Sequence, residues 1–146
     1  MTTIITKTEK ETYDIGLALG QKCQGGGVFM LCGDLGAGKT KLVQGLAFGL
    51  GIKVRVNSPT FNILKLYKIN QRLRPKRIIK RFCHIDAYRL KSAVDLETLG
   101  VEEFFSDPQT VVAIEWAEKV KKIWPRLAKI IKIKSLNETS RKVSIL

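Results

Sequence analysis

The sequence predicts an α/β fold, a three-layer sandwich in which helices cover both faces of a central mixed, largely parallel β-sheet. Three observations favour it. Apolar runs of strand length recur at residues 28–32, 81–86 and 110–115. A glycine-rich turn follows the first run and opens a segment with helical spacing. The other two runs each end in a carboxylate, as is typical of strands that carry a site at one edge of a parallel sheet.

The remaining elements follow in chain order. A first helix should begin after Thr8, because Thr8-Glu9-Lys10-Glu11 is a capping-box pattern, and Gly25-Gly26-Gly27 should end it. A second helix is predicted after the glycine-rich turn, with Gly51 as the residue that ends it. Its apolar residues at helical spacing are Leu42, Val43, Leu46, Ala47 and Leu50. Further strands are expected near residues 61–67, 128–133 and 141–146.

Length and composition favour one compact domain. A chain of 146 residues, 45% of them hydrophobic, can bury a core of its own. We therefore expect a single domain over residues 1–146, with a basic insertion at about 68–81. Neither a run of apolar residues long enough to span a membrane nor a signal peptide is evident, so we expect a cytoplasmic protein. Three scattered cysteines and one histidine favour reduced thiols over a zinc site.

The charge is strongly positive and unevenly distributed. The formal net charge is +13, residues 65–81 hold eight basic and no acidic side chains, and residues 119–142 hold nine more basic ones. Residues 95–118 hold seven acids and neither lysine nor arginine. The molecule should therefore present electrically distinct faces, and a basic face suits RNA or an acidic protein. A solvated, lysine-rich surface is an equally good interpretation of the same charges.

The glycine-rich turn matches the phosphate-binding P-loop pattern G-x-x-x-x-G-K-[ST]. The matching residues are Gly33, Asp34, Leu35, Gly36, Ala37, Gly38, Lys39 and Thr40. Glycines allow backbone N–H groups to surround a phosphate, Lys39 can reach the β- and γ-phosphates, and the Thr40 hydroxyl can take a Mg²⁺ position. The motif predicts a P-loop NTPase-like fold that binds a nucleoside triphosphate with Mg²⁺, which the resemblance given below narrows to ATP. The alternative is a glycine-rich turn that opens an ordinary helix.

Two acids are candidates for the second half of such a site. Asp86 and Glu115 each end an apolar run, and a carboxylate at the end of a neighbouring strand can hold Mg²⁺ or its water opposite the P-loop hydroxyl. Either acid can instead cap the next element, which is the more common role of a strand-end acid without a P-loop. The presence of the P-loop makes the functional interpretation the better one.

Four motifs in order resemble the bacterial TsaE (YjeE) family, over most of the chain. They are Gly33 to Thr40, Ser58-Pro59-Thr60-Phe61, His84-Ile85-Asp86-Ala87-Tyr88-Arg89 and Ile114-Glu115-Trp116. The resemblance implies an ATPase of the machinery that makes N6-threonylcarbamoyladenosine at position 37 of tRNA. It also implies the TsaB–TsaD pair as partners, with tRNA contacted indirectly or through the basic surface, and no role for a membrane or DNA.

The resemblance also implies roles for single residues. Lys39 and Thr40 match the phosphate and magnesium positions, and Thr60 matches a switch-like threonine that approaches the γ-phosphate. Asp86 and Glu115 match two essential acids. Of the two, Glu115 is expected near the metal and Asp86 in support of catalysis.

Two aromatic residues of these motifs have interpretations of their own. Trp116 matches a tryptophan near the nucleotide, although a core tryptophan fits the pattern nearly as well. His84 is better explained as a packed structural histidine than as a base.

Two features depart from the family pattern. Lys41 replaces a small hydroxylated residue on the helix flank, where contact with phosphate is unnecessary. The segment between Tyr67 and Phe82 is longer and more basic than usual, and suggests a hairpin extension or a surface loop. Two other functions remain open at this level. One is a small P-loop kinase with a basic lid, and the other is an RNA-binding module with a vestigial nucleotide site.

Overall fold

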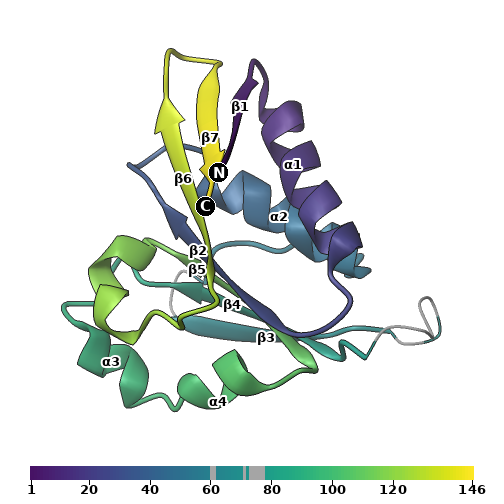
Figure 1. Cartoon of the computed structure of the whole chain (residues 1–146), viewed down its shortest axis with the longest axis vertical. Helices are drawn as coiled ribbons and strands as arrows, with labels where there is room; N and C mark the ends of the chain where they lie inside the picture. The colour runs from purple at the N-terminus through teal and green to yellow at the C-terminus, as the bar shows by residue number, and fades with distance from the viewer. Residues whose placement is uncertain (60–61, 71, 73–77) are drawn as a thin grey trace.

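The computed structural model describes residues 1–59, 62–70, 72 and 78–146 (Figure 1). Thr60, the predicted switch threonine, lies outside the described residues, and so does Phe61 of the same motif. Three basic residues of the insertion also lie outside them, namely Arg74, Lys76 and Arg77.

Seven strands form one sheet in the described part of the chain, in the order β1-β7-β6-β2-β5-β4-β3. Their bounds are β1 Thr2–Thr6, β2 Gly27–Cys32, β3 Leu64–Lys68, β4 Arg81–Asp86, β5 Thr110–Glu115, β6 Lys129–Ser135 and β7 Arg141–Ile145. The four central strands, β6, β2, β5 and β4, run parallel, whereas the outer pairings β1–β7, β7–β6 and β4–β3 are antiparallel. The predicted mixed sheet is thus confirmed, with its parallel part at the centre.

Helices cover both faces of this sheet, which confirms the three-layer α/β fold (Figure 1). One face carries α1 (Glu9–Lys22) and α2 (Lys39–Leu50), and the other carries α3 (Ala93–Glu97), α4 (Glu102–Ser106) and the 3₁₀ helix η2 (Ala117–Ile123). Strand β2 serves both layers because its side chains alternate. Phe29 and Leu31 belong to the core under α2, and Val28 and Met30 to the core on the opposite face.

The helix that follows the P-loop is held by close backbone packing against α1. A Cβ on Gly16 of α1 would lie 1.9 Å from the carbonyl oxygen of Leu42, and one on Gly45 of α2 would lie 2.0 Å from the carbonyl oxygen of Tyr13. Any larger residue at these positions would push the helices apart. Because α2 begins inside the P-loop, this packing also fixes the position of the loop.

The start of α1 and the end of α2 have the caps that the sequence predicts, with one difference at Thr8, whereas α1 ends at Lys22, before the predicted Gly25-Gly26-Gly27. The Thr8 hydroxyl accepts from the backbone N–H of Glu11 at 3.1 Å, but the Glu11 carboxylate accepts from Lys7 N–H instead of Thr8 N–H. Gly51 has φ 101° and donates to carbonyl oxygens in the last turn of α2. Glycine suits this position because an L side chain rarely adopts such a φ.

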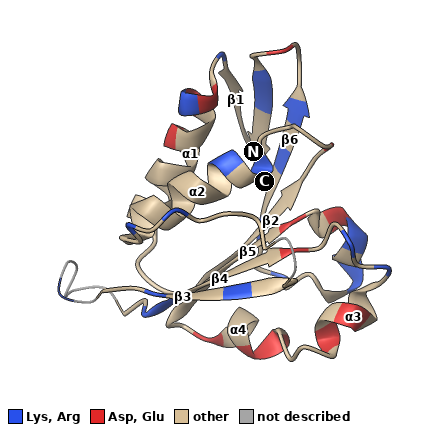
Figure 2. Cartoon of the chain, turned by 180° about the vertical axis from the view of Figure 1, so that it is seen from behind, with Lys and Arg blue, Asp and Glu red and all other residues tan. Residues whose placement is uncertain are grey.

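The charges separate only in part, because Lys119, Lys121 and Lys122 of η2 lie on the same face of the sheet as the acidic helix α3 (Figure 2). Four of the seven acids of the 95–118 stretch lie on α3 and α4, while basic residues lie along β6 and β7 on another part of the molecule. The other three acids, Asp107, Glu115 and Glu118, lie outside these two helices, and Glu115 is buried at the end of β5. Among the described residues, no helix has the length and apolarity needed to cross a membrane. Cys23, Cys32 and Cys83 form no disulfide in the described part of the chain, and Cys32 and Cys83 are buried.

Asp107 stabilises the start of β5 and gives a prediction about acid stability. Hydrogen bonds from Thr110 and the Gln109 N–H, together with Arg81, lower the pKa of Asp107 from its ordinary value of 3.8 to about 2. The unfolded chain therefore takes up this proton first as the pH falls. We expect the parent to be more stable than Asp107→Asn above pH 3.8, and the difference to disappear as the pH falls through about 2.

Urea unfolding of both proteins across this pH range measures the difference. Thr98→Val, which removes a hydroxyl bonded within α3 to the carbonyl oxygen of Val94, serves as a control whose effect should not vary with pH. A difference between Asp107→Asn and the parent that is constant across the range would contradict the assignment of this carboxylate.

Candidate functional site

The P-loop connects the carboxyl end of β2 to the first turn of α2 at the centre of the sheet. Gly33, Gly36 and Gly38 have φ values of 147°, 74° and 103°, which L residues rarely adopt. A Cβ on Gly33 would also lie 2.2 Å from the carbonyl oxygen of Ile133. Leu35 at the tip is 79% exposed, so the tip is open to solvent next to the N-terminus of α2, where an anion is favoured.

Lys39 is buried at the base of this loop. Its Nζ donates to the carbonyl oxygens of Gly33 at 2.5 Å and Asp34 at 2.8 Å. The same Nζ lies 3.6 Å from the centre of the Trp116 ring, close enough for a cation–π contact. Trp116 reaches this place because it has φ 58°, a left-handed conformation at the start of η2. The lysine is therefore enclosed by loop carbonyls on one side and an aromatic ring on the other.

Burial is the main influence on the charge of Lys39, and it lowers the pKa of the ammonium below 10.5. Nearby carboxylates oppose this shift, in the order Glu115, Glu118, Asp86 and Asp34. A buried ammonium has lost hydration, and phosphate oxygens can replace that hydration with charge-assisted hydrogen bonds.

The end of β5 meets the first turn of α2. Thr40 Oγ1 donates to Glu115 Oε2 at 2.7 Å, and His84 Nε2 lies 2.8 Å from Glu115 Oε1. His84 is fully buried and the Glu115 side chain is 2% exposed. The parallel register of β4 and β5 places Asp86 directly opposite Glu115. The two predicted acids thus lie side by side at the carboxyl edge of the sheet, next to the P-loop.

The donor atoms at this edge fit Mg²⁺. Thr40 and Glu115 offer a hydroxyl and a carboxylate oxygen within 2.7 Å of each other, and Mg²⁺ prefers oxygen ligands. The described residues contain no group of three or more acidic, histidine or cysteine side chains able to enclose a metal. Mg²⁺ in nucleotide sites is held by one or two protein oxygens together with phosphate and water, so this sparse donor set is the expected kind.

Asp86 is held in place from two sides. It accepts hydrogen bonds from the Ser58 hydroxyl and, at 2.9 Å, from the backbone N–H of Tyr88. A pocket of about 250 Å³ opens beside it, and Arg89 is among the side chains that line this pocket. Ser58 belongs to the predicted switch motif, so the described part of that motif contacts the second acid.

The sequence assigned no role to three residues near the loop, although Tyr88 belongs to one of the four family motifs. Glu118 accepts from the backbone N–H of Gly33 at 3.3 Å, and Arg141 of β7 donates to the carbonyl oxygen of Gly36 at 3.4 Å. The Tyr88 ring lies 4.9 Å from that of Trp116. Glu118 follows Glu115 by three residues, a spacing that could have identified it. Arg141 is one of many basic residues in its region and has no distinguishing pattern.

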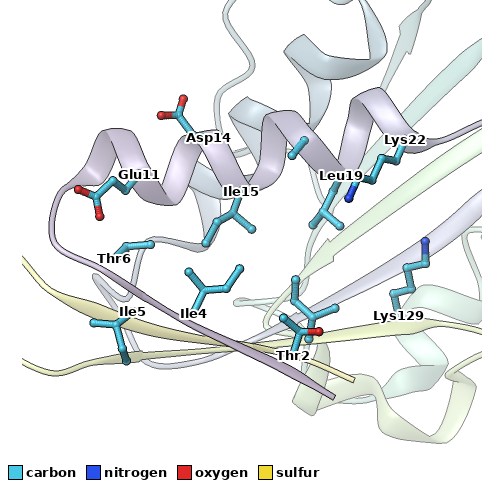
Figure 3. Close-up of a pocket in the computed structure, with 12 residues that line it drawn as sticks. Thr2, Ile4, Ile5, Thr6, Glu11, Asp14, Ile15, Leu19, Lys22 and Lys129 are labelled. Atoms are coloured by element: carbon cyan, nitrogen blue, oxygen red, sulfur yellow. The ribbon is translucent and has the colours of Figure 1, made fainter.

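A larger groove lies away from this site. It has a volume of about 620 Å³ and separates β1 from α1, where Ile4 of the strand and Ile15 and Leu19 of the helix point into it (Figure 3). Its walls are mainly apolar, with Glu11 and Asp14 towards one end and Lys22 and Lys129 towards the other (Figure 3). It contains none of the P-loop residues and neither of the strand-end acids. The groove is therefore separate from the P-loop and from the smaller pocket beside Asp86.

Comparison with known proteins agrees with this arrangement. A family model described as "Threonylcarbamoyl adenosine biosynthesis protein TsaE" matches residues 6–143. The chain belongs to the TsaE family. A TsaE protein from Treponema pallidum is 33% identical over 141 residues, which are 97% of each chain. A TsaE protein from Bacillus subtilis is 37% identical over 139 residues, which cover 95% of this chain and 81% of that one.

A solved structure is similar over nearly the whole chain. The crystal structure of YdiB from Bacillus subtilis superposes with a TM-score of 0.77 at 30% identity, covering 99% of this chain and 83% of that one. The α/β architecture with a mixed seven-stranded sheet is therefore the architecture of a TsaE-family protein.

Proposed function

We propose that this TsaE-family protein binds and hydrolyses ATP with Mg²⁺ as part of the machinery that makes N6-threonylcarbamoyladenosine at position 37 of tRNA. The observation that carries the proposal is the Thr40–Glu115 contact of 2.7 Å at the mouth of a P-loop whose lysine is buried among acids. The names of the relatives, which are tRNA threonylcarbamoyladenosine biosynthesis proteins, support the pathway.

Each residue of the site has a part in the proposed reaction. Backbone N–H groups of the P-loop other than those of Gly33 and Ala37, together with the N-terminus of α2, bind the phosphates, and Lys39 adds positive charge among them. Thr40 and Glu115 hold Mg²⁺, which when bound offsets negative charge on the β- and γ-phosphates. Trp116 closes the side of the site that faces Lys39.

The attack of water on the γ-phosphate requires a second set of groups. Asp86 lies opposite Glu115 and is held by Ser58 and Tyr88, which suits it to orient the attacking water. We propose that Thr60, next to this network in the sequence, approaches the γ-phosphate when the loop from Ser58 is ordered around it.

The kinase alternative finds no support in the path of the chain. The basic segment that would form its lid connects β3 to β4, which pair as an antiparallel hairpin, and Ile69 N–H donates to the Lys80 carbonyl oxygen at 2.9 Å. A kinase lid would normally follow several helices that build an acceptor pocket, and the described residues form no such helices between α2 and β4. The hairpin therefore extends the edge of the sheet.

The proposed partners are TsaB and TsaD, in the cytoplasm, and the experiment that tests the function measures their effect on hydrolysis. We expect slow phosphate release by this chain alone and an acceleration on the order of tenfold or more with TsaB–TsaD, because a partner can order the Ser58 loop around the nucleotide. Phosphate release is followed with and without the pair, in Mg²⁺ and in EDTA. If phosphate release is as fast without TsaB–TsaD as with the pair at saturation, the coupling is refuted. If EDTA does not slow hydrolysis, the proposed Mg²⁺ requirement is refuted.

The basic insertion at about 68–81 gives a separate prediction about partners. Replacing Arg72, Arg74, Lys76 and Arg77 with serine should leave ATP binding unchanged. It should also weaken assembly with tRNA or TsaB–TsaD at low salt and reduce the salt dependence, because these cations bind by releasing counterions or by pairing with acids.

Binding curves at low and high salt measure this effect. A control with the same loss of charge replaces four exposed lysines elsewhere, namely Lys10, Lys22, Lys53 and Lys122, with serine. If both quadruple variants assemble equally well at every salt concentration, the basic insertion has no role in partner binding.

A further inference from the structure

His84 is a buried residue that the proposed reaction leaves without a role. It lies in β4 on the same face of the sheet as Phe82 and Asp86, because side chains alternate along a strand. Its ring stacks on that of Phe82, with centroids 6.2 Å apart and an interplanar angle of 20°. The side chain is fully buried beneath the site, two residues before the point where Asp86 lies opposite Glu115.

The hydrogen bonds of the ring distinguish this histidine from packing alone. Nε2 lies 2.8 Å from Glu115 Oε1, and an ionised carboxylate only accepts, so Nε2 carries the proton of this bond. Nδ1 has no hydrogen-bond partner among the described residues. An unpaired buried nitrogen is unfavourable, so a phenylalanine would fill this place better if packing were its whole purpose.

The bond from His84 completes the contacts of the Glu115 carboxylate. Oε1 accepts from His84 on β4, and Oε2 accepts from Thr40 on α2. A glutamate side chain has several rotatable bonds, and hydrogen bonds to opposite oxygens fix both its extension and the plane of its carboxylate. Without the His84 bond, the contact from Thr40 would leave that plane free to rotate.

We infer that His84 is a positioning residue for the metal site: its Nε2–H holds Oε1 of Glu115 so that Oε2 faces Thr40 and Mg²⁺. The inference rests on the proposed role of Glu115 as a metal ligand. His84 itself touches neither nucleotide nor metal. Partners of this kind set the orientation of metal ligands, and their loss weakens metal binding even when every ligand remains.

Two substitutions of His84 separate the hydrogen bond from the packing. His84→Phe keeps a ring against Phe82 but has no donor, whereas His84→Gln places an amide N–H near the position of Nε2. We measure the Mg²⁺ concentration that gives half of the magnesium-dependent gain in affinity for fluorescent ADP. It should rise about 10- to 100-fold in His84→Phe and stay within about threefold of the parent in His84→Gln. Affinity in EDTA should be equal in all three proteins.

The outcomes separate this inference from the proposed function. If the parent gains no affinity from Mg²⁺, the metal site itself is wrong. The positioning role is refuted if the parent gains affinity from Mg²⁺ and His84→Phe needs the same Mg²⁺ concentration as the parent. A urea transition shows beforehand that His84→Phe is folded. If His84→Phe does not fold, His84→Asn replaces it, since its amide is one methylene shorter than that of glutamine. Equal Mg²⁺ requirements for Asn and Gln would then refute the role.

A double-mutant comparison tests whether His84 acts through Glu115. In a Glu115→Gln background, adding His84→Phe should not raise the Mg²⁺ requirement further, because the ligand that His84 orients is already altered. An additional rise equal to that seen in the parent would show that His84 acts on the metal by another route and would overturn the inference.

Discussion

Replacing Lys39 with alanine is expected to abolish tight binding of ATP and ADP. The buried ammonium is surrounded by the carboxylates of Glu115, Glu118, Asp86 and Asp34, and phosphates must enter this acidic environment. Without the ammonium, no positive charge offsets the repulsion between the phosphates and these carboxylates. We expect the affinity to fall by about 100-fold or more, since charge-assisted hydrogen bonds to phosphate are among the strongest that a side chain makes.

Titration with fluorescent ADP measures this loss, and Lys41→Ala is the matched control. Lys41 is two residues away on the same helix, but its Nζ pairs with Glu9 of α1 at 3.1 Å and is outside the P-loop contacts. The control should bind nucleotide like the parent. A Lys39→Ala protein that binds within a factor of about two of the parent would show that the loop does not hold phosphate as proposed.

The sequence predicts the P-loop well because the loop is a local structure. Its conformation depends on Gly33, Gly36 and Gly38, and each of these glycines adopts a positive φ. The two strand-end acids could also be predicted, because the ends of parallel strands share one edge of the sheet. Their direct opposition depends on the register of β4 against β5, and the sequence pattern does not determine it.

Other elements could not be predicted from local pattern. Helices α3 and α4 have five residues each, too few for helical periodicity to stand out, and β1 is a strand because it pairs with β7 at the far end of the chain. The contact between Lys39 and Trp116 depends on a left-handed tryptophan, a conformation that the residue type does not suggest. His84 and Glu115 are 31 residues apart, and only the folded sheet brings them together.

Replacing Glu115 with glutamine is expected to remove ATP hydrolysis while leaving much of the nucleotide affinity. The amide keeps the size of the side chain, but it loses the negative charge that holds Mg²⁺ with Thr40. Lys39 and the loop N–H groups still bind the phosphates. The lost interaction acts mainly on charge that develops during the reaction, so kcat should fall by about 10²–10³-fold or more, with a much smaller change in affinity for ADP.

Phosphate release at saturating ATP, with TsaB–TsaD present, measures the loss in Glu115→Gln, and fluorescent ADP titration measures the affinity that remains. Glu97→Gln removes the same charge from the exposed surface of α3 and should hydrolyse ATP like the parent. Turnover at the parent rate in Glu115→Gln would exclude Glu115 from the metal site. If Glu115→Gln loses as much nucleotide affinity as Lys39→Ala, Glu115 contributes to nucleotide binding instead. The enzyme–nucleotide complex would then depend on Glu115 as strongly as the transition state does.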